Sequence, residues 1–165
     1  MKSTIALAAA LLAASAAVAA PETCSKPGTT AANVAVTKRL YQAMNTRSGQ
    51  ILDGVLAVGW RDIPMPPGQG PGLAGMKASI KLFGSVFKDF TVTNDEFIAT
   101  GNQVVVRSTN RGTHVGTFAG IAPTGKSFAM TSIDIHTLCD GKIIETRHVE
   151  DWLGTLVQIG FLPLK

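Results

Sequence analysis

The sequence predicts an α+β domain in which helices come first and a curved antiparallel sheet follows. Three observations support this fold class. Apolar residues recur at helical spacing up to about residue 87, they alternate with polar residues from residue 90 onward, and glycine-containing turn signals separate the alternating runs. Helices packed against one face of such a sheet form a cone, and the open end of a cone is a natural pocket.

The first half of the domain contains the expected helices. A first helix is expected to begin at a Thr30 or Asn33 cap and to end within residues 45–49. Its apolar stripe consists of Val34, Val36, Leu40, Tyr41 and Met44. A short second helix is expected at residues 51–56, a brief strand at 58–62 and a third helix at 76–87.

Four long strands are expected in the second half, separated by turn signals. Gly101-Asn102, the run from Gly120 to Gly125, and Asp140-Gly141 mark the three turns. The strands are expected at about 90–98, 104–117, 127–138 and 142–149. A closing helix is expected at residues 151–159.

The segment from Pro64 to Gly75 contains four prolines and four glycines in twelve residues. This composition predicts a loop without regular structure. A loop of this length is either a binding loop or lid, or a plain surface connection, and the sequence leaves both readings open.

The N-terminus is expected to direct export. Met1-Lys2 gives a positive start, residues 5–12 are an apolar run, and Ala17-Val18-Ala19 supplies small residues for cleavage. We expect a secretory signal at 1–19, a flexible lead at 20–30 and one domain at 31–165. The alternative is an apolar N-terminal helix of the domain. Export would be periplasmic or secreted, with no membrane anchor left after cleavage.

Charge patterning argues against nucleic-acid binding. The formal net charge is +4 at pH 7, and Lys2 in the expected signal supplies one of these charges. The basic residues are scattered, without a basic run or interleaved aromatics. Phosphate-binding glycine loops and the Gly-x-Ser-x-Gly elbow are also missing from the sequence. The expected pocket of the cone makes a small-molecule ligand the expected partner.

The chain has two cysteines, Cys24 and Cys139. In an oxidising compartment they could form a disulfide that ties the N-terminal lead to the end of a strand. The alternative is two unpaired thiols, and the sequence leaves both open.

Acids and imidazoles gather between Asp134 and Asp151, which is unusual in a chain poor in ionisable groups. Because side chains alternate along a strand, Ser132, Asp134 and His136 share one face with Leu138. On the next strand, one face carries Ile144, Thr146, His148 and Glu150. If both faces line the pocket, these groups form either an acid/base dyad or a polar layer without catalysis.

Other candidate residues have weaker support. His114 lies between glycines in a strand and is expected at the pocket mouth or at the surface. Trp60 and Trp152 are expected in the core or the pocket wall. Two histidines and two carboxylates without a recognised ligand spacing predict no metal site.

Several short motifs resemble one known family, the SnoaL-like polyketide cyclases, also called predicted ester cyclases. The motifs are Gly112-x-His114-x-Gly116, Gly120-Ile121-x-Pro123-Thr124-Gly125, Asp134, Asp140-Gly141-Lys142-Ile143, Asp151 and Gln158-Ile159-Gly160. Weaker similarity extends to residues 71–75 and 87–90, so the resemblance covers most of the expected mature chain. It implies the nuclear transport factor 2-like fold, an α+β cone.

The resemblance also implies a reaction. The best-known members of the family close a polyketide ring by intramolecular aldol condensation without a metal or organic cofactor. Their acid/base aspartate in the last strand corresponds to His148, and their pocket histidine corresponds to Asp134. The resemblance therefore implies His148 as base and Asp134 as orienting group or acid. His136 and Glu150 would support them, and Asp151 would cap the last helix or orient His148.

Two kinds of function follow. The first is an exported enzyme that performs acid/base chemistry, such as aldol-type cyclisation or isomerisation, on a small and largely apolar carbonyl compound. The second is a binding or interaction module that uses the same fold without catalysis. A homodimer formed through the convex sheet face is expected in either case.

Overall fold

The computed structural model describes residues 24–66 and 68–162 of the 165-residue chain. The signal expected at 1–19 lies outside the described residues. The elements, in chain order, are α1 (Thr30–Thr46), α2 (Gly49–Asp53), β1 (Leu56–Ile63), α3 (Gly72–Val86), β2 (Phe87–Thr100), β3 (Gln103–His114), β4 (Ser127–Cys139), β5 (Lys142–Glu150) and α4 (Trp152–Gln158). In this described part, no helix has both the length and the apolar character to cross a membrane.

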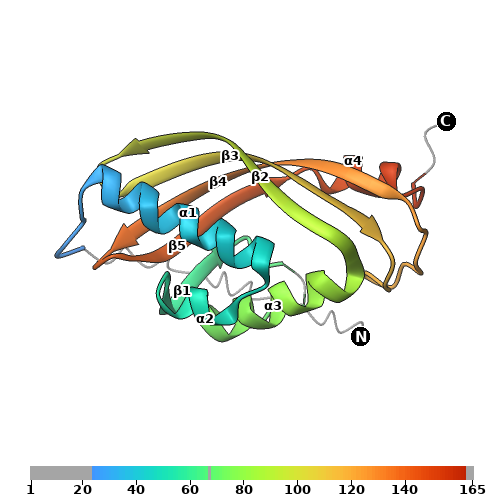
Figure 1. Ribbon diagram of the computed structural model, residues 1–165, viewed down its shortest axis with the longest axis horizontal. Helices are drawn as coiled ribbons and strands as arrows, with labels where there is room; N and C mark the ends of the chain where they lie inside the picture. The colour runs from blue at the N-terminus through green and yellow to red at the C-terminus, as the bar shows by residue number, and fades with distance from the viewer. Residues whose placement is uncertain (1–23, 67, 163–165) are drawn as a thin grey trace, which may run out of the picture.

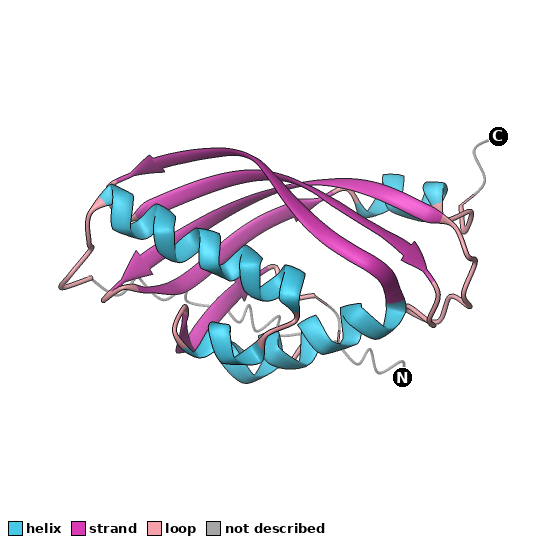
Figure 2. Ribbon diagram, viewed as in Figure 1, coloured by secondary structure: helices cyan, strands magenta, loops and turns pink. Residues whose placement is uncertain are grey.

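The five strands form one curved sheet in the order β1-β5-β4-β3-β2. The four long strands pair antiparallel as a meander, whereas β1 pairs in parallel with β5. Figure 1 shows the sheet arching over α1 and α3, and Figure 2 shows these helices on the same side of the sheet. The predicted α+β cone is confirmed.

The start of α3 differs from the prediction, because the helix begins inside the Pro/Gly-rich run expected to be a loop. Pro71 is its N-cap, and Gly72 has a positive φ of 65°. A side chain at Gly75 would collide with the carbonyl oxygen of Gly70. The glycine therefore permits the preceding loop to lie directly on the helix, instead of breaking the helix.

The first strand, β1, is longer than the predicted 58–62 segment. Its residues pair with β5, a partner more than 80 positions away in the sequence. Local patterning cannot show a pairing of this range. The parallel pairing is important for function because it brings the end of β1 beside the polar face of β5.

An aromatic cluster closes one side of the cone. The ring of Phe87 is fully buried and lies 5.1 Å from that of Phe128 and 5.2 Å from that of Phe118 between centroids. Phe118 stacks on Trp152 at 5.1 Å, and Phe83 packs against both. These aromatic pairs fix α3 and α4 against the sheet and form part of the wall described below.

The N-terminal lead is attached to the narrow end of the cone. Cys24 and Cys139 form a disulfide, so the first of the two alternatives for the cysteines is the observed one. The carbonyl of Lys26 accepts a hydrogen bond of 3.0 Å from the amide of Asp140. Cys24 and Lys26, which were expected in a flexible lead, are therefore bound to the β4–β5 hairpin.

Candidate functional site

The cone encloses a cavity of about 830 Å³ between the concave face of the sheet and α1 and α3. Its volume lies within the range of about 300–1,000 Å³ that is typical of small-molecule sites. Apolar side chains make up most of the wall, among them Leu40, Met76, Ile80, Phe83 and Met130. Six of the polar lining side chains come from β4 and β5.

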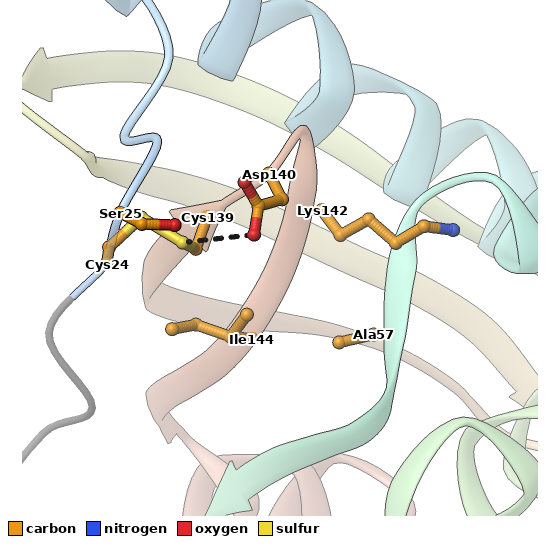
Figure 3. Close-up of a pocket in the computed structure, with 7 residues that line it drawn as sticks. All are labelled: Cys24, Ser25, Ala57, Cys139, Asp140, Lys142 and Ile144. Atoms are coloured by element: carbon orange, nitrogen blue, oxygen red, sulfur yellow. Dashed lines mark hydrogen bonds between the residues drawn. A yellow bond between two sulfur atoms is a disulfide. The ribbon is translucent and has the colours of Figure 1, made fainter.

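A second hollow, of about 330 Å³, lies at the disulfide on the narrow end. Figure 3 shows Cys24, Cys139, Lys142 and Ile144 around it. Among the described residues that line this hollow, none is a histidine and none has a displaced pKa. The larger cavity is therefore the candidate site.

The predicted facing of the two polar strands is confirmed. Asp134 lies directly opposite His148, and Ser132 lies opposite Glu150. All of these residues line the cavity, as do His136 and Thr146, which also lie opposite each other.

One residue of the predicted face is displaced. The pairing of β4 with β5 shifts between Thr137 and Leu138, which leaves Ile144 without a partner. Ile144 lines the outer hollow, as Figure 3 shows, and is not among the residues that line the cavity. The predicted alternation of β5 is therefore wrong at Ile144, and it is right from Thr146 to Glu150.

A chain of hydrogen bonds runs across the inner part of the cavity and ends at Asp134. Trp60 Nε1 donates to Thr146 Oγ1 at 3.0 Å, and Thr146 Oγ1 lies 2.9 Å from His136 Nδ1. His136 Nε2 lies 2.9 Å from the Tyr41 hydroxyl, which donates to Asp134 Oδ2 at 2.9 Å. Every donor has an acceptor if His136 is neutral with its proton on Nε2, a tautomer assigned from the network.

The charges along this chain follow from burial. Burial lowers the pKa of His136 to about 3, so its ring is neutral at ordinary pH. Burial also raises the pKa of Asp134 to about 6, while the hydrogen bond from Tyr41 acts in the opposite direction. At pH 7 Asp134 is mostly a carboxylate, but one that takes up a proton readily.

His148 lies in a different environment, beside the end of β1. Its Nε2 is 2.9 Å from the carbonyl oxygen of Pro64 and 3.2 Å from Asp62 Oδ1. The hydrogen bond to Asp62 is the largest cause that raises the pKa of His148 to about 9. His148 is therefore a cation at neutral pH.

Glu150 completes the outer group of polar residues. Its Oε2 accepts a hydrogen bond of 2.6 Å from Trp152 Nε1 and lies 3.9 Å from His148 Nδ1. Burial raises the pKa of Glu150, and the charge of His148 partly offsets that effect. Trp60 and Trp152 both line the cavity, and Trp60 also belongs to the buried core, so both expected readings apply to Trp60.

Two other predicted residues lie outside the cavity. Asp151 is the N-cap of α4 and accepts from the amide of Gly154 at 2.8 Å, which is one of its two expected roles. His114 lies at neither the mouth nor the surface: it is fully buried, packed against Phe87, and its Nδ1 is 3.3 Å from Thr124 Oγ1. Directly after β3, the amides of Val115 and Gly116 donate to the carbonyl of Val86, and Gly116 has no room for a side chain there.

Three residues of the site were not identified from the sequence. Tyr41, the only tyrosine, was assigned to an apolar helix stripe, which gives no sign that its hydroxyl meets a carboxylate. Asp62 and Gln69 reach the cavity through the long-range pairing of β1 and the packing of the loop on α3. For Asp62, the available signal was a carboxylate at the end of an expected strand, directly before a long loop.

The arrangement is suited to moving protons. A carboxylate with a pKa near 6 and a cation line the same largely apolar cavity, where electrostatic interactions are stronger than in water. Among the described residues, no three His, Cys, Asp or Glu side chains are grouped so as to hold a metal ion.

Comparison with known proteins gives one consistent family. The model of the SnoaL-like polyketide cyclase family matches residues 35–159. The chain is 35% identical over 65 residues to aklanonic acid methyl ester cyclase DnrD of Streptomyces peucetius, a match that covers 39% of this chain and 45% of that protein. The chain thus spans less than half the length of this relative.

Solved structures agree with the sequence match. TsrD from Streptomyces laurentii is 29% identical, with a TM-score of 0.76 over 82% of this chain and 99% of that chain. IdmH from Streptomyces antibioticus is 27% identical, with a TM-score of 0.67 over 78% and 98%. Because the family model spans well over half of the sequence, this chain belongs to the SnoaL-like polyketide cyclase family and has its nuclear transport factor 2-like fold.

Proposed function

We propose that this protein is a cofactor-independent cyclase or isomerase that acts on a small, largely apolar carbonyl compound. The observation that carries the proposal is the pairing of Asp134 with His148 across two strands, on the wall of an apolar cavity. Their pKa values, about 6 and about 9, leave a base and an acid side by side at neutral pH. This reverses the roles expected from the family alignment.

In this reaction Asp134 removes a proton from the carbon next to a carbonyl group. The electron pair of the broken C–H bond forms an enolate, whose carbon attacks a second carbonyl carbon of the same molecule and closes a ring. His148 Nδ1–H donates a proton to the resulting alkoxide. Transfer of the proton from Asp134 to His148 then restores both groups and is favoured by their pKa values. The net reaction is an isomerisation, so no oxidant or reductant is needed.

The proposed substrate is a polyketide ester or a compound of similar size and polarity. The cavity supplies apolar walls for a ring system and a polar strip for its oxygens. The name of the DnrD relative specifies aklanonic acid methyl ester, which makes this compound the first probe to use.

The experiment compares wild type with Asp134→Asn and His148→Gln on aklanonic acid methyl ester. Turnover is expected to fall by about 10²–10⁴-fold in each variant. In D2O, Asp134→Asn should also lose exchange of the acidic C–H, whereas His148→Gln should keep it. Asp53→Asn, on the exposed surface beside Lys77, is the matched control and should behave as wild type.

Full turnover by Asp134→Asn would overturn the proposed role of Asp134. Binding of the probe without turnover by wild type would instead support a module that binds ligands without catalysis.

We also propose export and dimerisation. The apolar run and small residues before position 20 support export, which N-terminal sequencing of protein recovered outside the cytoplasm would test by a start at Ala20. Exposed Ile133 and Val149, adjacent on the outer face, support a homodimer through the sheet. Val149→Lys should then lower the sedimentation coefficient to that of a monomer, and a wild-type monomer at all concentrations would refute this.

A further inference from the structure

At the end of β1, the carboxylate of Asp62 lies between β5 and the loop that follows β1. Asp62 Oδ1 lies 3.2 Å from His148 Nε2, and Asp62 Oδ2 accepts a hydrogen bond of 2.7 Å from Gln69 Nε2. The side chains of Asp62 and His148 are each only 10% exposed. Both carboxylate oxygens of Asp62 are therefore engaged within the protein.

The contacts of His148 fix the direction of its ring. Nε2 has two acceptors, Asp62 and the carbonyl of Pro64. Nδ1 forms no hydrogen bond with any described residue, and its distance of 3.9 Å from Glu150 Oε2 is too long for one. Nδ1–H is therefore the one donor of this ring that a ligand in the cavity can use.

Asp62 is itself held from a second element. Ser79 on α3 donates to Gln69 Oε1 at 2.8 Å, so a relay runs from α3 through Gln69 to Asp62 and His148. The loop that carries Gln69 lies on α3, where Gly75 leaves room for the carbonyl of Gly70. A carboxylate fixed in this way can hold an imidazole in one orientation.

Several titratable groups face His148, but among the described side chains only Asp62 forms a direct hydrogen bond with it. Asp134 and His136 approach from β4, and Glu150 lies on the same strand. Tyr41 from α1 contacts Asp134 and His136, and the cavity-lining residues of α3 are uncharged. Asp62 is the largest cause of the raised pKa of His148.

We propose that Asp62 is a positioning residue, which turns the Nδ1–H of His148 toward the ligand and keeps the imidazole cationic. The catalytic meaning of this inference rests on the proposed function, in which the alkoxide takes its proton from a cation with one free N–H. The Gln69–Ser79 relay extends the control of His148 to the loop and α3.

The experiment is an NMR titration of the three histidine rings in the ligand-free protein, and therefore needs no substrate. In wild type, the ring of His148 should titrate near pH 9. In Asp62→Asn, which removes the charge at nearly constant shape, the midpoint should fall by 1 pH unit or more, toward the ordinary histidine value of about 6.5. Asp62→Glu keeps the charge on a longer arm and should keep the midpoint above 8.

Glu150→Gln is the matched comparison, since it removes the other carboxylate that raises the pKa of His148. Its shift should be smaller than that of Asp62→Asn, because Glu150 forms no hydrogen bond with His148. Equal or larger displacement by Glu150→Gln, or an unchanged midpoint in Asp62→Asn, would overturn the assignment. If Asp62→Asn does not fold, a wild-type midpoint near 6.5 would overturn it equally.

The titration separates this inference from the proposed function. A large shift in Asp62→Asn together with no turnover of any ester by wild type would leave the positioning role intact and remove the reaction. Turnover that persists in Asp62→Asn with a shifted midpoint and an alkaline limit lowered by the same amount supports both.

Discussion

His136 and His148 lie on adjacent strands of one concave face, yet their pKa values move in opposite directions, to about 3 and about 9. His136 is buried, and its two ring nitrogens form hydrogen bonds with hydroxyl groups, which carry no charge that would stabilise a protonated imidazole. His148 meets a carboxylate and a peptide carbonyl, both of which favour the charged form. Its ring is also closer to solvent.

The comparison shows that the partners of an imidazole decide its chemical role more than its position on a sheet does. The inner histidine is a fixed, neutral link that passes hydrogen bonds from Trp60 toward Asp134. The outer histidine is a cation held by a carboxylate. Of the two rings, only that of His148 carries a proton that it can donate to a ligand at neutral pH.

The largest expected effect concerns the inner histidine and acid stability. Because folded His136 has a depressed pKa, its contribution to stability is present above about pH 6.5 and is lost as the pH falls toward about 3. Over this range the free energy of unfolding of wild type should fall by about 2–4 kcal/mol from this residue alone. Urea unfolding at a series of pH values measures the slope.

His136→Gln should lose most of this slope, whereas His148→Gln should keep it. For His148 the sign is opposite: its raised pKa gives stability that is present below pH 6.5 and is lost as the pH rises through about 9. An unchanged acid slope in His136→Gln would show that the inner ring is not held neutral, and the contrast between the two histidines would fail.

A smaller effect is expected from Asp134, the carboxylate opposite His148 on the neighbouring strand. The pKa of Asp134 is raised in the folded state from 3.8 to about 6, so its contribution to stability is present at low pH and is lost as the pH rises through that window. At pH 8 Asp134→Asn should therefore increase the free energy of unfolding by about 1–2 kcal/mol while it removes activity. Thermal unfolding at pH 4 and pH 8 measures this, and a variant less stable than wild type at pH 8 would contradict it.

The smallest effect should come from the link between the inner chain and the base. Tyr41→Phe removes the hydrogen bond that lowers the pKa of Asp134, so this pKa should rise above 6 by about 0.5–1 unit. Carbon-13 NMR of the carboxyl group follows the titration without a substrate. Thr146→Val breaks the chain two links away and should move the pKa of Asp134 less; the reverse order would show that the chain does not act through Tyr41.

Much of the fold could be predicted because its signals are local. Alternation over the last four strands and the turns at Gly101 and Asp140 reflect backbone geometry that each segment adopts with its immediate neighbour. The same alternation placed Asp134 and His148 on one face. The start of α3 could not be predicted, because glycine there serves close packing with the loop, which composition alone does not show.

The site was only half predictable for a related reason. Its β4 and β5 members follow from strand periodicity, but Tyr41 and Asp62 come from elements joined to the sheet by long-range packing. The roles of Asp134 and His148 depend on these two residues, since Tyr41 opposes the effect of burial on the pKa of Asp134 and Asp62 raises the pKa of His148. The bulge at Ile144 could not be predicted either, because the alternation of apolar and polar residues does not show where the pairing of two strands shifts.

The disulfide has a consequence for the order in which the molecule matures. Cys24 and Cys139 are 115 positions apart, and Cys139 is the last residue of β4. During synthesis Cys24 has no partner until α1, α2, α3 and four of the five described strands have been made. The disulfide can therefore form only after most of the domain has been synthesised. It then joins the N-terminal lead to the narrow end of the cone.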